Sequence, residues 1–177
     1  MHRLISFVLL AFSLPLVPAQ APGRLLFEAP EGWKTRPAAS AMRAAEFILP
    51  KVAGDSEDAD VVVYYFGGQG GDVEANISRW VGQMQQPDGR PSKEVAKRST
   101  RTVNGTDMTM LEVTGTYVAE VRPGATEHFN KPGFRMRAVV VPTPRGPYFI
   151  KMLGPDKTVR RWSASFDGFL ATLAFRP

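Results

Sequence analysis

The clearest pattern of hydrophobic and polar positions lies between Asp60 and Gln86. A β-branched and aromatic run over 61–66 predicts a buried strand, and a glycine-rich turn follows it directly. Behind the glycines, apolar residues recur every ~3.6 positions, with polar residues on the opposite side. The members of this stripe are Val73, Ile77, Trp80, Val81 and Met84. The stretch therefore predicts a strand, a turn and a helix that is capped by Asp72 and ended by Pro87.

Extended runs separated by turn residues predict further strands on both sides of this unit. They cover 25–29, 40–49, 94–103, 108–118, 135–141 and 147–153. The pair Asn104-Gly105 predicts a tight hairpin, because both residues tolerate a positive φ angle. A second helical stripe, with Asp156 as its predicted cap, lies near the C-terminus and is typical of core packing. Its members are Val159, Trp162, Phe166, Phe169, Leu170 and Leu173. The order of strands, helix, antiparallel strands and helix predicts an α+β layer fold.

The first residues of the chain have the pattern of an export signal. A positive start, an apolar run over 4–17 and the small-residue pattern Val17-Pro18-Ala19 predict a signal peptide over 1–19. A cut after Ala21 is a second option, and retention of the signal as an anchor is also open. We expect a single domain over 20–177, exported to the periplasm or the extracellular space. The apolar run is short and contains prolines, so no stable membrane span is expected after cleavage.

The charge and the cysteine content of the chain exclude several kinds of partner and of active site. The formal net charge is +5 at pH 7 and is dispersed along the chain. A dispersed charge of this size fits a basic soluble protein, with attraction to anionic envelope polymers as the alternative. No nucleic-acid motif occurs, so nucleic acid is not an expected partner. The chain contains no cysteine, which excludes disulfides, a thiolate nucleophile and thiolate metal sites.

The glycine turn is the first candidate binding site. Bare N–H groups at a helix N-terminus can hold phosphate, sulfate or carboxylate, so the Gly67–Asp72 turn is a candidate site for a small ligand or anion. Its candidate residues are Gly68, Gly70 and Gly71, with Arg79 farther along the helix shaft. The structural alternative is that the glycines only reverse the chain from strand to helix. The spacing G-G-x-G-G matches neither a dinucleotide fingerprint nor a P-loop, and the Asp72 carboxylate would repel an anion.

The longest predicted loop, 120–134, is the second candidate site. The loop and the glycine turn together predict a partner-binding surface made of Lys131, Phe134, Arg135, Gly68, Gly70 and Arg79. Phe129 and Phe134 would be its apolar anchors, and Arg135 a polar contact. The local alternative is that Lys131 and Arg135 are solvated and that Phe134 belongs to the core. The loop also holds His128, the one histidine that follows the predicted signal.

Metal binding and catalysis are weakly supported by the sequence. The acidic stretch 54–60 contains clustered oxygens that Ca²⁺ could use, but it lacks the EF-hand order of ligands, and we expect a solvated connection without metal. No G-x-S-x-G elbow occurs, and no neighbouring motif orients His128 as a base. We therefore expect no catalytic residues, no cofactor and no enzymatic activity.

Several sequence blocks carry a family resemblance. The block 27–33 (FEAPEGW) resembles the opening of PsbP-like domains. Four more blocks are similar to uncharacterised exported bacterial proteins of that superfamily: 65–71 (YFGGQGG), 76–80 (NISRW), 131–136 (KPGFRM) and 146–151 (GPYFIK). The resemblance implies a curved antiparallel sheet with helices on both faces, an α/β/α sandwich. It also implies a binding or assembly module rather than an enzyme. We expect a monomer with an unknown protein or envelope partner.

Overall fold

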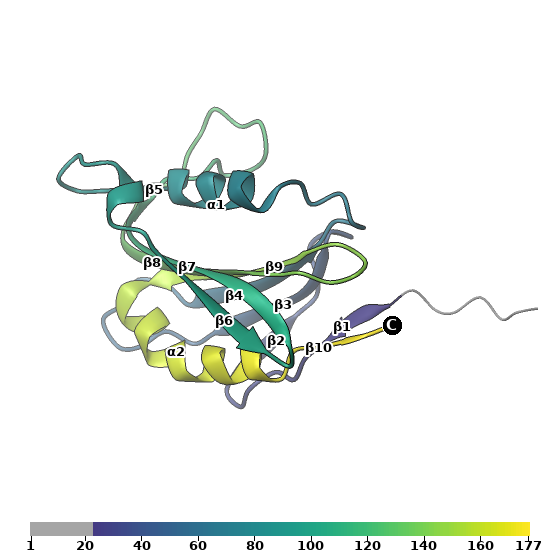
Figure 1. Cartoon of the computed structure of the whole chain (residues 1–177). Coiled ribbons are helices and arrows are strands. Elements are labelled where there is room, and N and C mark those ends of the chain that lie inside the picture. The colour runs from purple at the N-terminus through teal and green to yellow at the C-terminus, as the bar shows by residue number, and fades with distance from the viewer. Residues whose placement is uncertain (1–22) are drawn as a thin grey trace, which may run out of the picture.

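The computed structural model describes residues 23–177. The predicted signal peptide over 1–19 and both of its cleavage positions lie outside the described residues. Residues 23–177 form a mostly antiparallel sheet with helix α1 (Val73–Gly82) on one face and helix α2 (Asp156–Ala171) on the other (Figure 1). The predicted α+β fold class is confirmed. Neither helix in this range is long and apolar enough to cross a membrane.

The main sheet has eight strands in the order β2-β3-β4-β9-β8-β7-β5, with β6 also paired to β7. Its strands are β2 (Lys34–Arg36), β3 (Arg43–Leu49), β4 (Ala59–Tyr65), β5 (Met84–Gln85), β6 (Lys97–Val103), β7 (Thr106–Tyr117), β8 (Lys131–Val141) and β9 (Tyr148–Pro155). A separate antiparallel pair joins β1 (Arg24–Leu26) to β10 (Ala174–Arg176). This pair brings the two ends of the described chain together (Figure 1).

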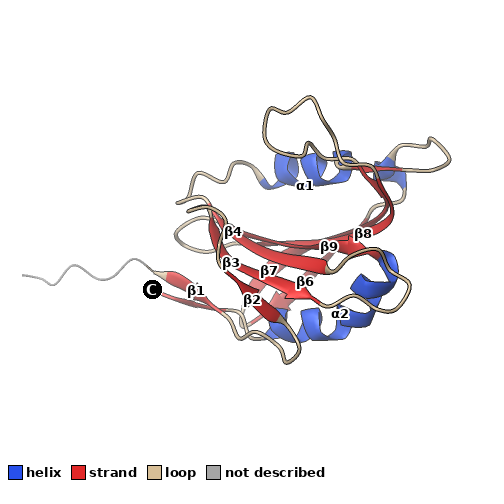
Figure 2. Ribbon diagram, turned by 180° about the vertical axis from the view of Figure 1, so that it is seen from behind, coloured by secondary structure: helices blue, strands red, loops and turns tan. Residues whose placement is uncertain are grey.

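The face under α2 is sealed by a continuous aromatic and aliphatic core. The helix contributes Val159, Phe166 and Phe169, which are fully buried. Trp33 covers the edge of this core, with its ring centroid 5.2 Å from that of Phe169. Each such side chain contributes roughly 1.5–3 kcal/mol through burial. The ribbon seen from behind shows α2 lying along the sheet on the side opposite to α1 (Figure 2).

The N-terminus of α2 is capped from a distant loop rather than by its own first residue. Asp156 is the first helical residue, and the cap position is Pro155, so the predicted Asp156 cap is wrong. Instead the Asp55 carboxylate accepts hydrogen bonds from the backbone N–H and the hydroxyl of Thr158, at 2.8 and 2.6 Å. The acidic stretch before β4 therefore helps to fix α2 on the sheet.

Helix α1 covers the opposite face only in part. Asp72 caps it as predicted, accepting from the Ala75 N–H at 3.0 Å. Trp80 packs edge-to-face on Phe149, with centroids 6.0 Å apart. The helix ends at Gly82, well before Pro87, because the following residues pair with β7 as β5. A helix about 10 Å wide cannot cover eight strands spaced ~4.8 Å apart, so part of this face stays open.

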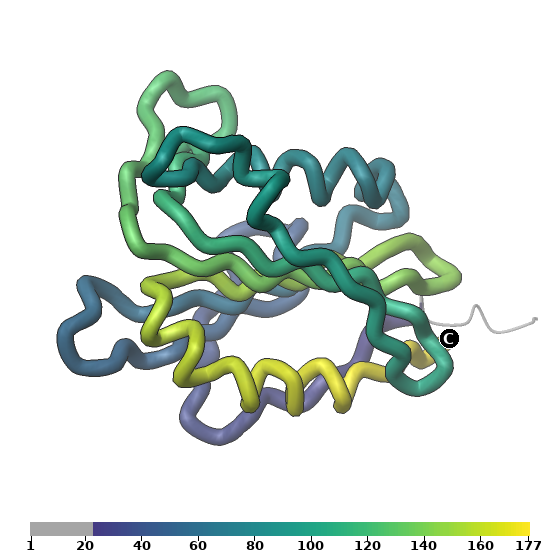
Figure 3. Tube along the Cα trace, turned by 60° about the vertical axis from the view of Figure 1, so that its left-hand side comes forward, coloured from purple at the N-terminus to yellow at the C-terminus, as the bar shows by residue number. Residues whose placement is uncertain are grey.

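The loop between β7 and β8 is shorter than predicted. Lys131 and Phe134 belong to β8, since Tyr117 pairs with Lys131 and Gly115 with Phe134 across a register shift. The connecting loop therefore covers 118–130, and it lies on the same side of the sheet as α1 (Figure 3). The proline and glycine at the end of the predicted loop therefore lie at a bulge within β8, and they do not prevent a strand from forming there.

Candidate functional site

A large cavity lies between α1 and the sheet. It has a volume of about 1040 Å³. Its floor is formed by Val62 and Tyr64 of β4 and by Lys151 and Leu153 of β9. Its walls come from α1, from the loop 118–130 and from the segment before β3. We call this cavity the α1 cleft.

Strand register determines which side chains reach the α1 cleft. Successive side chains of a strand point to opposite faces. Val61 and Val63 enter the core under α2, so the intervening Val62 faces the cleft. Val62 pairs with Lys151, which is the one charged residue of β9, a strand of sequence YFIKMLGP. The fold therefore places a lysine on the cleft floor between the apolar side chains of Val62 and Leu153.

Lys151 has few polar partners. Its Nζ is 3.4 Å from the side-chain oxygen of Gln83 and 5.8 Å from the ring centroid of Tyr117. It forms no ion pair with any carboxylate of residues 23–177. Burial lowers the pKa of Lys151 to about 8, and the charges of Arg79 and Arg43 act in the same direction against a smaller opposing effect of Asp60.

Arg79 is the second cation of the α1 cleft without a carboxylate partner. It lines the cleft from the last turn of α1. Its guanidinium donates to the Asn76 side-chain oxygen at 2.6 Å, and no ion pair of the described chain includes it. The Asn76 amide in turn donates to the carbonyls of Gly70 and Asp72, at 2.7 and 2.9 Å. Asn76 therefore links Arg79 to the glycine turn.

The glycine turn itself has a structural explanation. A Cβ atom on Gly70 would lie 2.4 Å from the Phe149 ring, and Gly68 and Gly71 have φ angles of +83° and +75°. These positions require glycine for packing and for backbone conformation. Asp72 already holds an N–H group at the helix N-terminus. None of the three glycines lines the α1 cleft. Asn76 connects Gly70 to Arg79, whereas Lys131 lies apart from the turn, in β8.

Lys131 and Phe134 both line the α1 cleft. The Lys131 ammonium pairs with Glu57 at 2.7 Å and lies 4.9 Å from the Phe129 ring centroid. Phe134 is buried and stacks on Tyr117, with centroids 6.3 Å apart. The Lys131 charge is therefore matched within the protein, and Phe134 belongs to the core beside the cleft.

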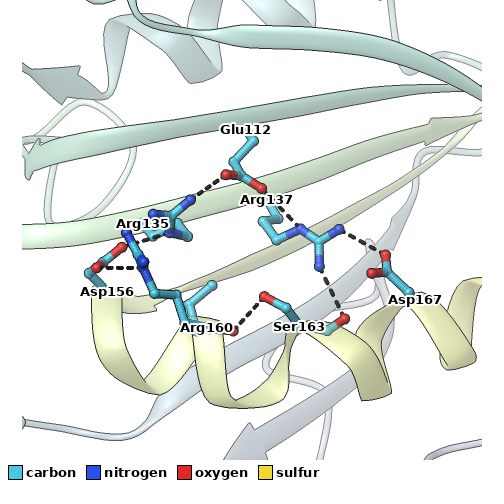
Figure 4. Close-up of polar contacts among 8 residues, drawn as sticks. Glu112, Arg135, Arg137, Asp156, Arg160, Ser163 and Asp167 are labelled. Atoms are coloured by element: carbon cyan, nitrogen blue, oxygen red, sulfur yellow. Dashed lines mark hydrogen bonds and ion pairs between the residues drawn. The ribbon is translucent and has the colours of Figure 1, made fainter.

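Arg135 does not lie with Lys131 and Phe134, which corrects its predicted place in a partner-binding surface. As the next residue along β8, it points to the opposite face, beneath α2 (Figure 4). Its guanidinium donates to Asp156 at 2.6 Å and also pairs with Glu112. Glu112 reaches Arg137 at 3.4 Å, and Arg137 reaches Asp167 of α2 at 2.8 Å. Arg135 thus joins the sheet to α2.

A second ion network closes the β2–β3 end of the α1 cleft. Glu46 is 1% exposed and receives hydrogen bonds from the Ala39 N–H and from Arg36, with Arg43 as a further ion pair. Burial by itself raises the pKa of Glu46, but the Ala39 N–H and the guanidinium groups of Arg43 and Arg36 together lower it below its ordinary value. Arg36 also pairs with Asp60 at 3.1 Å. These cations, unlike Lys151 and Arg79, are matched by carboxylates.

The remaining predicted candidates are held in local contacts. In the acidic stretch, Asp55 caps α2, Asp58 accepts from the Lys51 N–H at 2.8 Å, and Glu57 pairs with Lys131. No group of three metal-ligating side chains gathers within residues 23–177. His128 is exposed at the rim of the cleft, with its Nδ1 3.0 Å from the Thr126 carbonyl.

Comparison with known proteins shows the fold. No family model and no curated protein sequence matches the chain. LpqN of Mycobacterium tuberculosis, a protein involved in cell envelope biogenesis, matches at a TM-score of 0.52 and 10% identity, over 90% of this chain and 87% of LpqN. The two chains share a fold. At this identity the likeness carries no statement about function.

Two further structures are similar at lower scores. A Pseudomonas aeruginosa protein of unknown function matches at a TM-score of 0.48 and 16% identity, over 75% of this chain and 82% of its own. PsbP of the cyanobacterium Synechocystis matches at a TM-score of 0.45 and 12% identity, over 87% of this chain and 92% of its own. Structural neighbours thus include a PsbP protein, at low sequence identity.

Lys151 is the functional candidate that sequence reasoning missed. It lies inside the block 146–151, whose sequence pattern by itself predicts a strand and no binding role. The sequence does show a single lysine in the middle of an otherwise apolar strand. Burial of a charged group destabilises the fold, so such a residue is a candidate for a functional role.

Proposed function

We propose that this protein is an exported, monomeric, non-catalytic binding module, and that its binding surface is the α1 cleft. One observation carries the proposal: α1 leaves part of the sheet uncovered, and the uncovered part is a cavity of about 1040 Å³. A cavity of this size accommodates a small molecule or a short partner segment. The opposite face has no such space, because α2 packs on it through a closed core.

The composition of the cleft favours binding over catalysis. A hydrolytic site needs a nucleophile within hydrogen-bond reach of an oriented base. His128, the only histidine in the described chain, is exposed and contacts a carbonyl of its own loop. Lys151 and Arg79 carry positive charge into the cleft and form no ion pair with a carboxylate of the described residues. Export is supported by the signal pattern over 1–19.

The proposal is tested by blocking the cleft. Gly82 lines the cleft, and a Cβ atom there would have no atom within 4 Å, so Gly82→Trp fills the cavity from the end of α1 without a backbone clash. Gly82→Ala is the matched control. We expect a low-molecular-mass or a protein fraction of the host cell envelope to raise the thermal midpoint of the full chain and of Gly82→Ala, but not of Gly82→Trp.

Two outcomes would oppose this proposal. An equal thermal shift in Gly82→Trp would place the binding surface outside the cleft. If no fraction shifts any of the three proteins, and purified ligands also fail, the assignment as a binding module is wrong.

A further inference from the structure

The charges of the α1 cleft are unequally matched. Around its rim, Arg36 and Arg43 are paired with Glu46, and Lys131 is paired with Glu57. Lys151 on the half-buried floor and Arg79 on the exposed side of α1 have only the neutral side-chain oxygens of Gln83 and Asn76 as polar partners. The cleft therefore has positive charge at Lys151 and Arg79 that no carboxylate of the described chain pairs.

A purely structural role does not explain the unmatched Lys151, whereas Arg79 is exposed to solvent. Removing an ammonium from water is unfavourable, and the cost stays uncompensated when no carboxylate pairs with it. A Met side chain would fill the same space in β9 without the cost of a charge. Lys151 lies instead beside the positive charges of Arg79 and Arg43, whose repulsion makes its position more costly still. Cations arranged in this way are complementary to an anion that the protein does not itself supply.

Apolar and aromatic side chains lie around Lys151, and further charged residues line the rim. Val62 and Leu153 lie beside Lys151 on the floor, and Trp80 of α1 lies above it. Tyr117 stacks on Phe129 of the loop, with ring centroids 5.5 Å apart. A ligand that fills the cleft therefore meets charge at its centre and apolar surface around it. Inorganic phosphate matches only the first of these features.

We propose that the ligand of the α1 cleft is a small organic anion, with a carboxylate or phosphate group held between Lys151 and Arg79 and an apolar body against the aromatic wall. This inference rests on the proposed function and adds the chemical class of the ligand. Arg79 supplies a planar pair of donors that fits an oxyanion, and Lys151 supplies a point charge from the floor. Oxyanions also occur on lipid headgroups, and here the anion is taken from solution.

The test compares two ligands that differ in charge alone. 2-Naphthoate and 2-naphthamide have the same shape, and each is titrated into the purified full chain by calorimetry at pH 7. We expect 2-naphthoate to bind at least about tenfold more tightly than 2-naphthamide, since a charge-assisted contact is worth about 1.5–3 kcal/mol and 1.4 kcal/mol is a factor of ten. Inorganic phosphate should compete with 2-naphthoate and bind more weakly.

Three variants locate the charge that matters. Lys151→Met should weaken 2-naphthoate binding at least about tenfold and leave 2-naphthamide unchanged. Lys151→Arg should retain most of the preference for the anion. Lys157→Met removes the same charge from the exposed surface of α2, and it should bind both ligands as the parent does. Circular dichroism spectra of all variants check that the fold is intact.

The outcomes separate this inference from the proposal on which it rests. If both ligands bind equally and Lys151→Met has no effect, while Gly82→Trp abolishes binding, the cleft is a binding site but the anion assignment is wrong. If neither ligand nor any envelope fraction binds, the proposed function fails as well. If the chain instead sediments with phosphatidylglycerol vesicles in a Lys151-dependent manner and ignores 2-naphthoate, the free anion is excluded in favour of a lipid headgroup.

Discussion

The side chain of Lys151 lowers the stability of the folded protein. Its amine lies on the floor of the α1 cleft, in a strand whose neighbouring residues Ile150 and Met152 are fully buried. The pKa of about 8 means that the folded protein resists protonating this group, whereas the unfolded chain protonates it readily. The native state is therefore destabilised by this amine, and a single substitution could remove the unfavourable free energy.

The first prediction follows from this penalty. Lys151→Met should raise the free energy of unfolding at pH 7 by on the order of 1–3 kcal/mol, because a protonated amine is no longer buried beside Arg79 and Arg43. Urea denaturation of the two proteins measures the difference. Since the folded-state pKa is lowered, the unfolded state binds more protons above pH 8, and the parent should regain stability relative to the variant as pH rises from 8 toward 10. A gap that is constant or widens over this range would contradict the assignment.

The second prediction concerns binding and pH. An anion in the α1 cleft needs a protonated Lys151, so affinity for 2-naphthoate should be constant below pH 8 and fall by up to about tenfold per unit above it. The other groups that face this amine are Arg79, Arg43, Asp60 and Tyr117. Burial raises the pKa of Tyr117 to about 12, which lies above this range. Calorimetric titrations between pH 6 and 9.5 should show the fall in the parent, and Lys151→Arg should show none.

At the scale of elements, α2 and the sheet are joined by alternating charges. Glu112 of β7 lies between Arg135 and Arg137 of β8, and these reach Asp156 and Asp167 at the two ends of α2 (Figure 4). Both arginine side chains are 13% exposed, so their charges are poorly screened by solvent. Coulomb interactions in such a setting are stronger than those of a surface pair.

The third prediction tests this network. Glu112→Gln removes the charge shared by two poorly exposed guanidinium groups and should lower the free energy of unfolding by about 1–3 kcal/mol. The matched control is Glu74→Gln, which breaks the exposed pair with Arg98 and should leave the free energy of unfolding nearly unchanged, because solvent screens this pair. Chemical denaturation measures both. Equal effects would show that the network beneath α2 contributes no more than a surface ion pair.

Elements with a strong period were predictable from sequence, and short ones were not. The stripes of α1 and α2 and the hairpin at Asn104-Gly105 are fixed by local residue pattern, and the structure contains all three. Strands β2, β5 and β10 have two or three residues each and arise only from pairing with distant segments. The end of α1 at Gly82 depends on the pairing of β5 with β7, and the residues around Gly82 do not predict this pairing.

The candidate site was less predictable than the fold for the same reason. Lys131 and Phe134 were singled out from sequence and do line the α1 cleft. Arg135 was grouped with them because it is adjacent in sequence, yet neighbouring residues of a strand face opposite sides. Because the predicted loop runs to position 134, the sequence does not show that Phe134 and Arg135 belong to one strand and face opposite sides. Lys151 needed the pairing of β4 with β9 before its position on the cleft floor became visible.

At the scale of the whole molecule, two hydrophobic cores share one sheet. One lies under α2 and the other under α1, and the central strands β4, β9, β8 and β7 contribute residues to both. Neither core can be exposed without disturbing strands that the other requires. The layers should therefore unfold together.

The fourth prediction follows from this shared sheet. The chain has three tryptophans, of which Trp80 lies in the core under α1 while Trp33 and Trp162 belong to the core under α2. Trp80→Phe reports on the α2 side, and the double variant Trp33→Phe, Trp162→Phe reports on the α1 side. For each protein the fluorescence midpoint in urea should coincide with its own midpoint by far-ultraviolet circular dichroism. Separate midpoints would show that the two layers unfold independently.

The pairing of β1 with β10 also has a mechanical consequence. Arg24 at the start of β1 pairs with Arg176 at the end of β10, so both chain ends leave the ribbon on the same side. A force that pulls these ends apart loads the backbone hydrogen bonds one after another, as in opening a zipper, rather than all at once. The ribbon should peel away at low force, and the eight-stranded sheet that holds the α1 cleft would meet the load only afterwards.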